Sequence, residues 1–231
     1  MKCLVITGAS AGIGLHTAEA FVKAGYEVIN LSRRRCPLAT VTHINCDLSE
    51  PGFIESVGTQ MSSTLKQADQ VVLIHNAAKL TNDSAVETPS NNLRDVMEIN
   101  LIAPNTLNYF VLPYMQSGSS ILYVGSTLSE KAVPNSFSYV TSKHAMVGMM
   151  RSTCQDLAGR GIHTACICPG FTDTEMLRDH VPQDVMPQIA AMSAYERLVN
   201  PDEIAATLLW AAQNPVINGS IMHANLGQVE R

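Results

Sequence analysis

The chain has 231 residues, of which 46% are hydrophobic and 15% are charged, and its formal net charge is −5 at pH 7. This apolar content is enough for one large buried core, and it excludes a disordered chain or one that coats nucleic acid. The acidic balance gives no electrostatic reason to expect DNA, RNA or an anionic membrane as a partner. No apolar run approaches the length that spans a bilayer, and residues 4–6 are too short for the hydrophobic part of a signal peptide.

The six cysteines are spread along the chain, with no C-x-x-C pair and no zinc-ligand spacing. Cys166 and Cys168 would face the same side of a strand, where packing in the core is favoured over metal binding. We therefore expect reduced thiols, no metal site and a cytoplasmic location.

The first element expected in chain order is a strand over residues 2–7, because its continuous apolar run is typical of a strand buried on both faces. Gly8, Gly12 and Gly14 follow, and helical periodicity then continues to residue 24. A strand, a glycine turn and a helix form a phosphate site, because the backbone can approach closely and the helix N-terminus offers free N–H groups. A tight turn without a ligand is the alternative interpretation of these glycines.

The second strand, at residues 28–31, ends in Ser32 followed by Arg33, Arg34 and Arg35. Sites for an unphosphorylated ribose usually place Asp or Glu at this strand end, to accept a hydrogen bond from the 2′-hydroxyl. A guanidinium can instead bind a 2′-phosphate in a bidentate manner, so NADP(H) is preferred over NAD(H). Alternatively, the three arginines are a solvated surface run.

Alternating strands and helices continue to the end of the chain. Further strands are expected at residues 42–46, 70–74, 121–124, 164–168 and 220–224, with helices at 52–65, 93–114, around 139–157 and at 201–212. Pro104 predicts a kink or a break close to Asn100. This alternation predicts an α/β fold, with residues 1–231 forming a single-domain, doubly wound parallel sheet (Rossmann-like) and helices on both faces.

Tyr139 and Lys143 stand at i and i+4, so a helix places both side chains on one face. A phenol titrates near pH ~10 and is a poor proton donor or acceptor at neutrality unless its anion is stabilised. A nearby ammonium would supply that stabilisation, and Ser126, at the end of the strand before, could reach the same substrate oxygen. Taken alone, the pair also fits a surface aromatic beside a solvated lysine.

The segment at residues 171–199 is long, irregular and rich in methionine, and we expect it to form a lid over the substrate. Methionine here is consistent with an adaptable apolar pocket or with plain core filling. The identity of the substrate does not follow from these residues.

Together these segments resemble the short-chain dehydrogenase/reductase family over nearly the whole chain. Residues 7–14 match its T-G-x-x-x-G-x-G cofactor motif, and Ala78 stands where its N-A-G signature has glycine. Asn100, Ser126, Tyr139 and Lys143 match its catalytic tetrad in order and spacing. From the turn, the end of the second strand and the family's motifs, the residues expected to contact the cofactor are Gly8, Ser10, Gly12, Ile13, Gly14, Ser32, Arg33, Arg34, Asp47, Leu48, Asn76, Ala77, Tyr139, Lys143, Pro169, Gly170, Thr172 and Thr174.

The resemblance also implies a role for each member of the tetrad. Tyr139 would give its proton to the substrate carbonyl, and Lys143 would hold the ribose hydroxyls and stabilise the tyrosinate. Ser126 would polarise the substrate oxygen, and Asn100 would anchor a water that relays protons to bulk solvent.

We therefore expect an oxidoreductase that moves a hydride between NADP(H) and a small carbonyl compound or secondary alcohol, as a homodimer or homotetramer. A sugar-nucleotide epimerase or dehydratase is a rival, but it typically needs an extra substrate domain and a different glycine spacing. A second rival is an NADP(H)-sensing regulatory protein without turnover, which would have no need of a proton donor.

Overall fold

The computed structural model describes residues 1–228, so the last three residues of the domain predicted for residues 1–231 lie outside the described part. The described residues form one seven-stranded sheet in which every pairing is parallel, in the order β3-β2-β1-β4-β5-β6-β7. The strands are β1 Lys2–Thr7, β2 Glu27–Ser32, β3 Thr42–Asn45, β4 Gln70–His75, β5 Ser120–Val124, β6 His163–Pro169 and β7 Ser220–Ala224. The strand order reverses between β1 and β4, which confirms the predicted doubly wound sheet.

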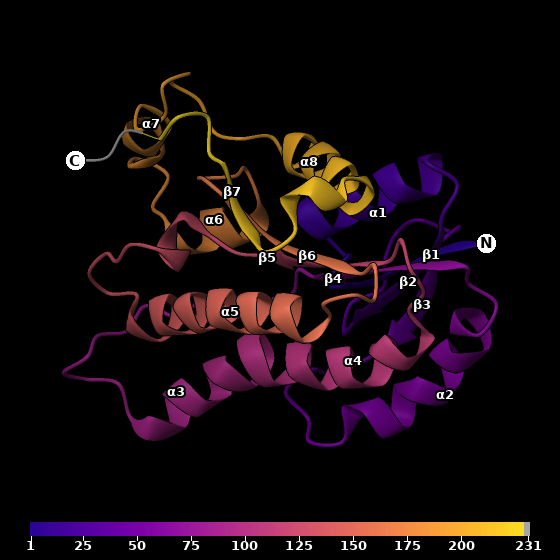
Figure 1. The fold of residues 1–231 in the computed structure, drawn as a ribbon. Helices are drawn as coiled ribbons and strands as arrows, with labels where there is room; N and C mark the ends of the chain where they lie inside the picture. The colour runs from indigo at the N-terminus through magenta and orange to yellow at the C-terminus, as the bar shows by residue number, and fades with distance from the viewer. Residues whose placement is uncertain (229–231) are drawn as a thin grey trace.

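Helices cover both faces of this sheet, as Figure 1 shows, with α2, α4 and α5 on one side and α1 and α8 on the other. The α-helices are α1 Gly12–Lys23, α2 Phe53–Leu65, α3 Ser90–Met97, α4 Ala103–Val111, α5 Phe137–Asp156, α6 Glu175–His180, α7 Met186–Ala190 and α8 Pro201–Gln213. Among the described residues, no helix is both long enough and apolar enough to cross a membrane.

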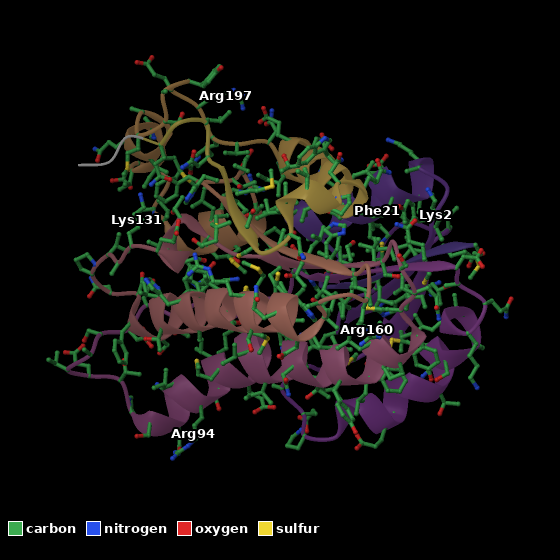
Figure 2. All side chains as sticks on the ribbon, in the orientation of Figure 1. Lys2, Phe21, Arg94, Lys131, Arg160 and Arg197 are labelled. Carbon is green, nitrogen blue, oxygen red and sulfur yellow. The ribbon has the colours of Figure 1, made fainter. Side chains whose placement is uncertain are left out.

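The continuous apolar run of β1 is explained by this double cover. Cys3 and Val5 belong to the core under α2, α4 and α5, whereas Leu4 and Ile6 belong to the core under α1 and α8. Phe21 of α1 is completely buried in the second core, and in Figure 2 it lies within the layers, whereas side chains such as that of Arg94 extend at the periphery. Burial of such a side chain contributes roughly 1.5–3 kcal/mol, so each face contributes to stability.

The helical stretch around Asn100 is interrupted where Pro104 predicts it. A π-helix, Glu98–Ile102, separates α3 from α4 and contains Asn100. Proline has no N–H to donate and clashes with the preceding turn, and widened turns of this kind recur where a helix is disturbed. The prediction of a kink or break near Asn100 is confirmed.

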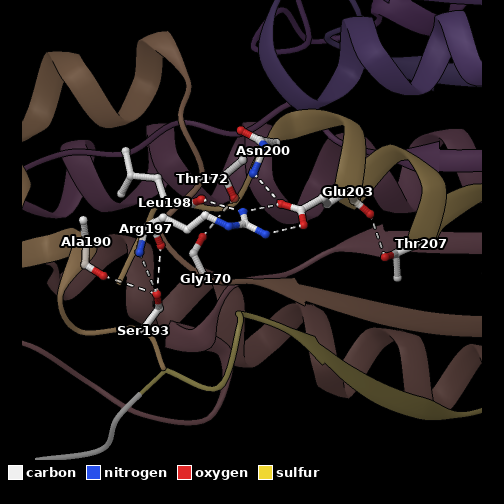
Figure 3. Close-up of polar contacts among 9 residues, drawn as sticks. All are labelled: Gly170, Thr172, Ala190, Ser193, Arg197, Leu198, Asn200, Glu203 and Thr207. Atoms are coloured by element: carbon white, nitrogen blue, oxygen red, sulfur yellow. Dashed lines mark hydrogen bonds and ion pairs between the residues drawn. The ribbon is translucent and has the colours of Figure 1, made fainter. Parts of the chain in front are cut away.

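The segment predicted as a lid leaves the sheet after β6 and returns beside its own start. Val199 N–H donates to Phe171 O at 2.8 Å, and Asp173 N–H donates to Val199 O at 3.0 Å, so the two ends form a short parallel bridge. Figure 3 shows the contacts that fix the returning end, where the Arg197 guanidinium binds both carboxylate oxygens of Glu203 at 2.7 Å. Residues 172–198 therefore leave the sheet and return to it at this bridge. We refer to them as the lid, after their predicted role.

Candidate active site

Tyr139 and Lys143 lie one turn apart on α5, as their spacing predicts. The Lys143 side chain is almost completely buried, and its Nζ donates a hydrogen bond to Val124 O at 2.7 Å. The same Nζ lies 5.4 Å from the ring centroid of Tyr139. The last residue of β5 therefore holds the ammonium near the phenol.

The acidity of the phenol differs from the sequence expectation. Burial raises the pKa of Tyr139 to about 12, and a hydrogen bond with the Ser126 side chain only partly opposes this effect. Burial also lowers the pKa of Lys143 to about 8. The lowering expected from Lys143 does not offset the burial that penalises the tyrosinate.

Ser126 follows β5 and caps the short 3₁₀ turn Thr127–Ser129. Its hydroxyl accepts the Leu128 N–H at 3.1 Å and also interacts with Tyr139, so capping fixes the hydroxyl where it meets the phenol. Its own N–H donates to Ser129 Oγ at 3.1 Å. The loop is thus built as a rigid support for the Ser126 side chain.

Gly125 explains why this loop can lie so close to β6. A Cβ at this position would lie 2.6 Å from Cys166 Sγ and 2.8 Å from Cys168 Sγ. Both thiols are free and buried, with their sulfurs 3.9 Å apart. They pack beneath the Ser126 loop, a position that their spacing alone did not indicate.

Asn100 is completely buried and its side chain makes three hydrogen bonds. Its Oδ1 accepts Lys79 N–H at 2.7 Å, and its Nδ2 donates to Lys79 O and to Ser142 Oγ, each at 2.9 Å. Asn100 therefore ties the loop after β4 to the helix that carries Tyr139.

The sequence analysis missed Asp83, which lies in that loop and accepts hydrogen bonds from the first residues of α5. Its carboxylate accepts Ser138 N–H at 3.0 Å and the Ser138 hydroxyl, and its backbone O accepts Phe137 N–H at 3.1 Å. Burial alone would raise the pKa of Asp83, but the hydrogen bonds from Ser138 outweigh burial and lower it. Nothing in the local sequence marks this aspartate, because its partner lies 55 positions away.

The glycine turn opens α1 and is closely packed at its glycine positions. Gly8 has a φ of +72°, and a Cβ on Gly14 would lie 2.3 Å from Gly8 O and 2.5 Å from Asn76 Nδ2. Ser10 and Ile13 are half-buried in the same turn. Because the first N–H groups of a helix have no partner within it, this close-packed turn can hold the phosphates of a dinucleotide.

Two asparagines brace the turn. Asn76, with Ala77 beside it, follows β4, and its Nδ2 donates to Thr7 O at 2.9 Å and to Gly8 O at 3.2 Å. Asn30 Oδ1 accepts Ala9 N–H at 2.8 Å from the middle of β2. The sequence analysis did not single out Asn30, although a buried asparagine in an otherwise apolar strand was a usable signal.

The residues predicted to contact the adenosine half gather at the ends of β2 and β3. Ser32 ends β2, Arg33 lies 4.0 Å from a carboxylate oxygen of Asp47, and Leu48 beside Asp47 is buried. Hydrogen bonds from the side chain and backbone of Ser49, with a smaller effect of Arg33, lower the pKa of Asp47.

Arg34 reaches across to the lid instead. Its Nη2 lies 2.8 Å from Oε2 of Glu175, the first residue of α6. The sequence analysis did not foresee this pair, which joins residues 141 positions apart.

The remaining predicted contacts lie where β6 leads into the lid. Pro169 ends β6, and a Cβ on Gly170 would lie 2.9 Å from Asn225 Cα, so this turn is also closely packed. Thr172 Oγ1 donates to Gly170 O at 3.0 Å. Thr174 caps α6, and its Cγ2 would be 3.1 Å from a Cβ on Gly12, so the lid begins directly against the glycine turn.

A cavity of about 370 Å³ opens beside the start of α5. Its lining is almost entirely polar and comes from the loop after β4, the loop before α5 and the lid: Asn82, Asp83, Ser84, Glu87, Pro134, Asn135, Ser136 and His180. It lies next to the segment that positions Tyr139, where a small substrate could enter.

The comparisons with known proteins agree with this arrangement. Residues 8–228 match the family model described as Enoyl-(Acyl carrier protein) reductase. The chain is 27% identical over 231 residues to "Carbonyl reductase family member 4" of Xenopus laevis, covering 96% of this chain and 95% of the relative. It is 26% identical over 238 residues to the 3-oxoacyl-[acyl-carrier-protein] reductase FabG of Salmonella typhimurium, covering 98% of this chain and 96% of the relative.

The fold is also shared with solved structures. The structure of a short chain dehydrogenase family protein from Francisella tularensis superposes with a TM-score of 0.90 at 24% identity, covering 98% of each chain. The seven-stranded parallel sheet and its helices thus belong to a known fold.

Proposed function

Because this chain belongs to the short-chain dehydrogenase/reductase family of oxidoreductases, we propose that it moves a hydride between NADP(H) and a small carbonyl compound or secondary alcohol, with Tyr139 as general acid and base. The observation that carries the proposal is the meeting of Ser126, Tyr139 and Lys143 at the end of β5, where the phenol bonds to the serine and lies 5.4 Å from the ammonium. A relative with this architecture is named a carbonyl reductase, which favours the same reaction class.

The proton is handled by the protein. In the reduction direction, the Tyr139 hydroxyl gives its proton to the substrate oxygen while Ser126 polarises that oxygen with a hydrogen bond. Bound NADP(H) supplies the hydride in this direction and takes it up in the other. With its pKa raised, the Tyr139 phenol is protonated at pH 7 and therefore holds the proton that the acid role requires.

Lys143 serves both the cofactor and the phenol. Its ammonium has three N–H donors, of which one is used by Val124 O, so the others can bind the ribose hydroxyls. As the proton leaves Tyr139, the developing phenolate is stabilised by this buried positive charge. Asn100 supports the water relay expected from the resemblance by holding the loop at Lys79 in place.

The preference for NADP(H) over NAD(H) is supported by the end of β2. Arg33 and Arg34 both follow Ser32, and both side chains are exposed, so they can turn toward a 2′-phosphate. No carboxylate occupies the position after β2 that would repel that phosphate. Leu31 of β2 pairs with Thr7 of β1, so the arginines follow a strand end beside the start of the glycine turn.

A homodimer or homotetramer is part of the same proposal. Tyr109 of α4 is 85% exposed and Ile102 just before it is 45% exposed, so the outer side of this helix carries uncovered apolar surface. Light scattering after gel filtration measures the mass, and a monomer at micromolar concentration would contradict this part.

The activity is tested by following NADPH absorbance with a panel of small ketones and aldehydes, and NADP with the matching alcohols. We expect turnover with at least one pair and faster turnover with the phosphorylated cofactor. The rival sensor predicts tight NADPH binding by titration calorimetry and no oxidation with any member of the panel.

A further inference from the structure

We propose that Glu175 is a specificity-determining residue for the cofactor: it occupies Arg34 until a 2′-phosphate displaces it, and this exchange unfastens helix α6. The inference rests on the proposed function, because it takes Arg34 as a ligand of the 2′-phosphate. It assigns a ligand class, the 2′-phosphorylated adenosine nucleotides, to a contact between the cofactor site and the lid.

The first residue of helix α6, Glu175, forms an ion pair with Arg34, which follows β2. Arg34 Nη2 and Glu175 Oε2 lie 2.8 Å apart, and the two side chains are 66% and 56% exposed. Directly before this pair, the Thr174 methyl group rests against Gly12 of the glycine turn. The start of the lid therefore lies against the glycine turn, where the dinucleotide phosphates would bind.

The last residue of α6 is fastened to the substrate side. His180 Nε2 lies 3.2 Å from Leu80 O, in the loop that Asn100 holds through Lys79. This short helix thus connects two places: the end of β2, which carries Arg34, and the loop beside the proposed substrate cavity. Loss of the Glu175–Arg34 ion pair frees the first residue of α6, while the contact between His180 and Leu80 O remains.

Competition for Arg34 follows from charge. Glu175 contacts the guanidinium through Nη2 alone, so donors remain for a phosphate, but the carboxylate and the phosphate repel each other when both are close. A 2′-phosphate carries more charge than Glu175, and an exposed ion pair is weak, so the phosphate wins. NAD(H) has a hydroxyl at this position and leaves the pair intact.

The test uses 2′,5′-ADP and 5′-AMP, which differ in the 2′-phosphate and carry no nicotinamide. We expect 2′,5′-ADP, and not 5′-AMP, to speed hydrogen exchange in residues 175–180 of the wild-type protein. Glu175→Gln should show fast exchange there without ligand and should bind 2′,5′-ADP about two- to five-fold more tightly, with 5′-AMP affinity unchanged.

Asp173→Asn is the matched control, because it removes a neighbouring ion pair of the lid, that of Asp173 with Arg178, and leaves Arg34 and Glu175 in place. It should leave the affinity for 2′,5′-ADP unchanged. If 2′,5′-ADP binding depends on Arg34, as shown by Arg34→Ala, but neither α6 exchange nor the Glu175→Gln affinity changes, the inference is wrong and the NADP(H) proposal stands. If 2′,5′-ADP binds no more tightly than 5′-AMP, both are wrong.

Discussion

The ammonium of Lys143 lies 5.4 Å from the ring centroid of Tyr139 while it donates to Val124 O, so a buried cation lies close to a half-buried phenol. Burial opposes the charged form of each, raising the pKa of Tyr139 to about 12 and lowering that of Lys143 to about 8. In this arrangement Tyr139 is protonated at neutral pH, and Lys143 is a source of pH-dependent stability.

The stability prediction concerns Lys143. Its folded pKa of about 8 lies below the model-peptide value of 10.5, so between these values the unfolded state binds more protons and the free energy of unfolding rises with pH. The full difference is on the order of 3–4 kcal/mol, from about 1.4 kcal/mol per pKa unit. Urea unfolding of the wild type and of Lys143→Met is measured from pH 7.5 to 10. The free energy of unfolding should rise with pH more steeply for the wild type than for the variant. The same pH dependence in both proteins would contradict the prediction.

The catalytic prediction concerns the hydroxyl of Tyr139. Tyr139→Phe removes the proton donor and should lower kcat by about 10²- to 10⁴-fold while NADPH still binds, as measured by fluorescence titration. Tyr26→Phe is a matched control, because the buried Tyr26 hydroxyl has no partner among the described residues. Its turnover should equal that of the wild type. Full activity in Tyr139→Phe would remove this residue from the mechanism.

Much of the fold could be predicted because the signals are local, and so could the placement of Tyr139 and Lys143 on one helix. The glycine spacing reflects a turn without room for a Cβ, and Pro104 marks the π-helix that contains Asn100. Long-range contacts could not be predicted in this way: Asp83 reaches Ser138, 55 positions away, and no periodicity encodes which loops meet. The pKa of Tyr139 could not be predicted either, because it depends on burial rather than on spacing.

The cofactor prediction concerns the arginines after β2. Replacing Arg33 and Arg34 together with alanine should weaken NADPH binding far more than NADH binding, because only NADPH carries the phosphate that these side chains would neutralise. Arg35→Ala provides a control that removes one positive charge one residue farther on. Isothermal titration with both cofactors measures the effect, and an equal loss for NADPH and NADH would contradict the assignment.

The positioning prediction concerns Asp83. Asp83→Ala leaves the Ser138 N–H at the start of α5 without its carboxylate partner, a change comparable to loss of a helix cap, which typically costs ~1 kcal/mol. Because Tyr139 is the next residue, kcat should fall several-fold while NADPH affinity changes little. Ser84→Ala tests whether any change in this loop has the same effect. Unchanged kcat in Asp83→Ala, with a lowered melting temperature, would leave Asp83 a purely structural residue.

The last prediction concerns the base of the lid, where Glu203 binds Arg197 through both oxygens and accepts Asn200 N–H at 2.9 Å. These hydrogen bonds lower the pKa of Glu203 to about 2 from an ordinary value of 4.5. The stabilisation is therefore complete above about pH 4.5 and is lost as the pH falls toward 2, because the unfolded carboxylate is protonated first. Glu203→Gln should have a lower melting temperature than the wild type at pH 7. The difference between the two melting temperatures should become smaller as the pH falls from 5 to 3. Glu196→Gln, a lid carboxylate for which the structure records no ion pair among residues 1–228, should show no such pH-dependent difference. A constant difference between the wild type and Glu203→Gln across this range would mean that the charge of Glu203 does not hold the lid in place.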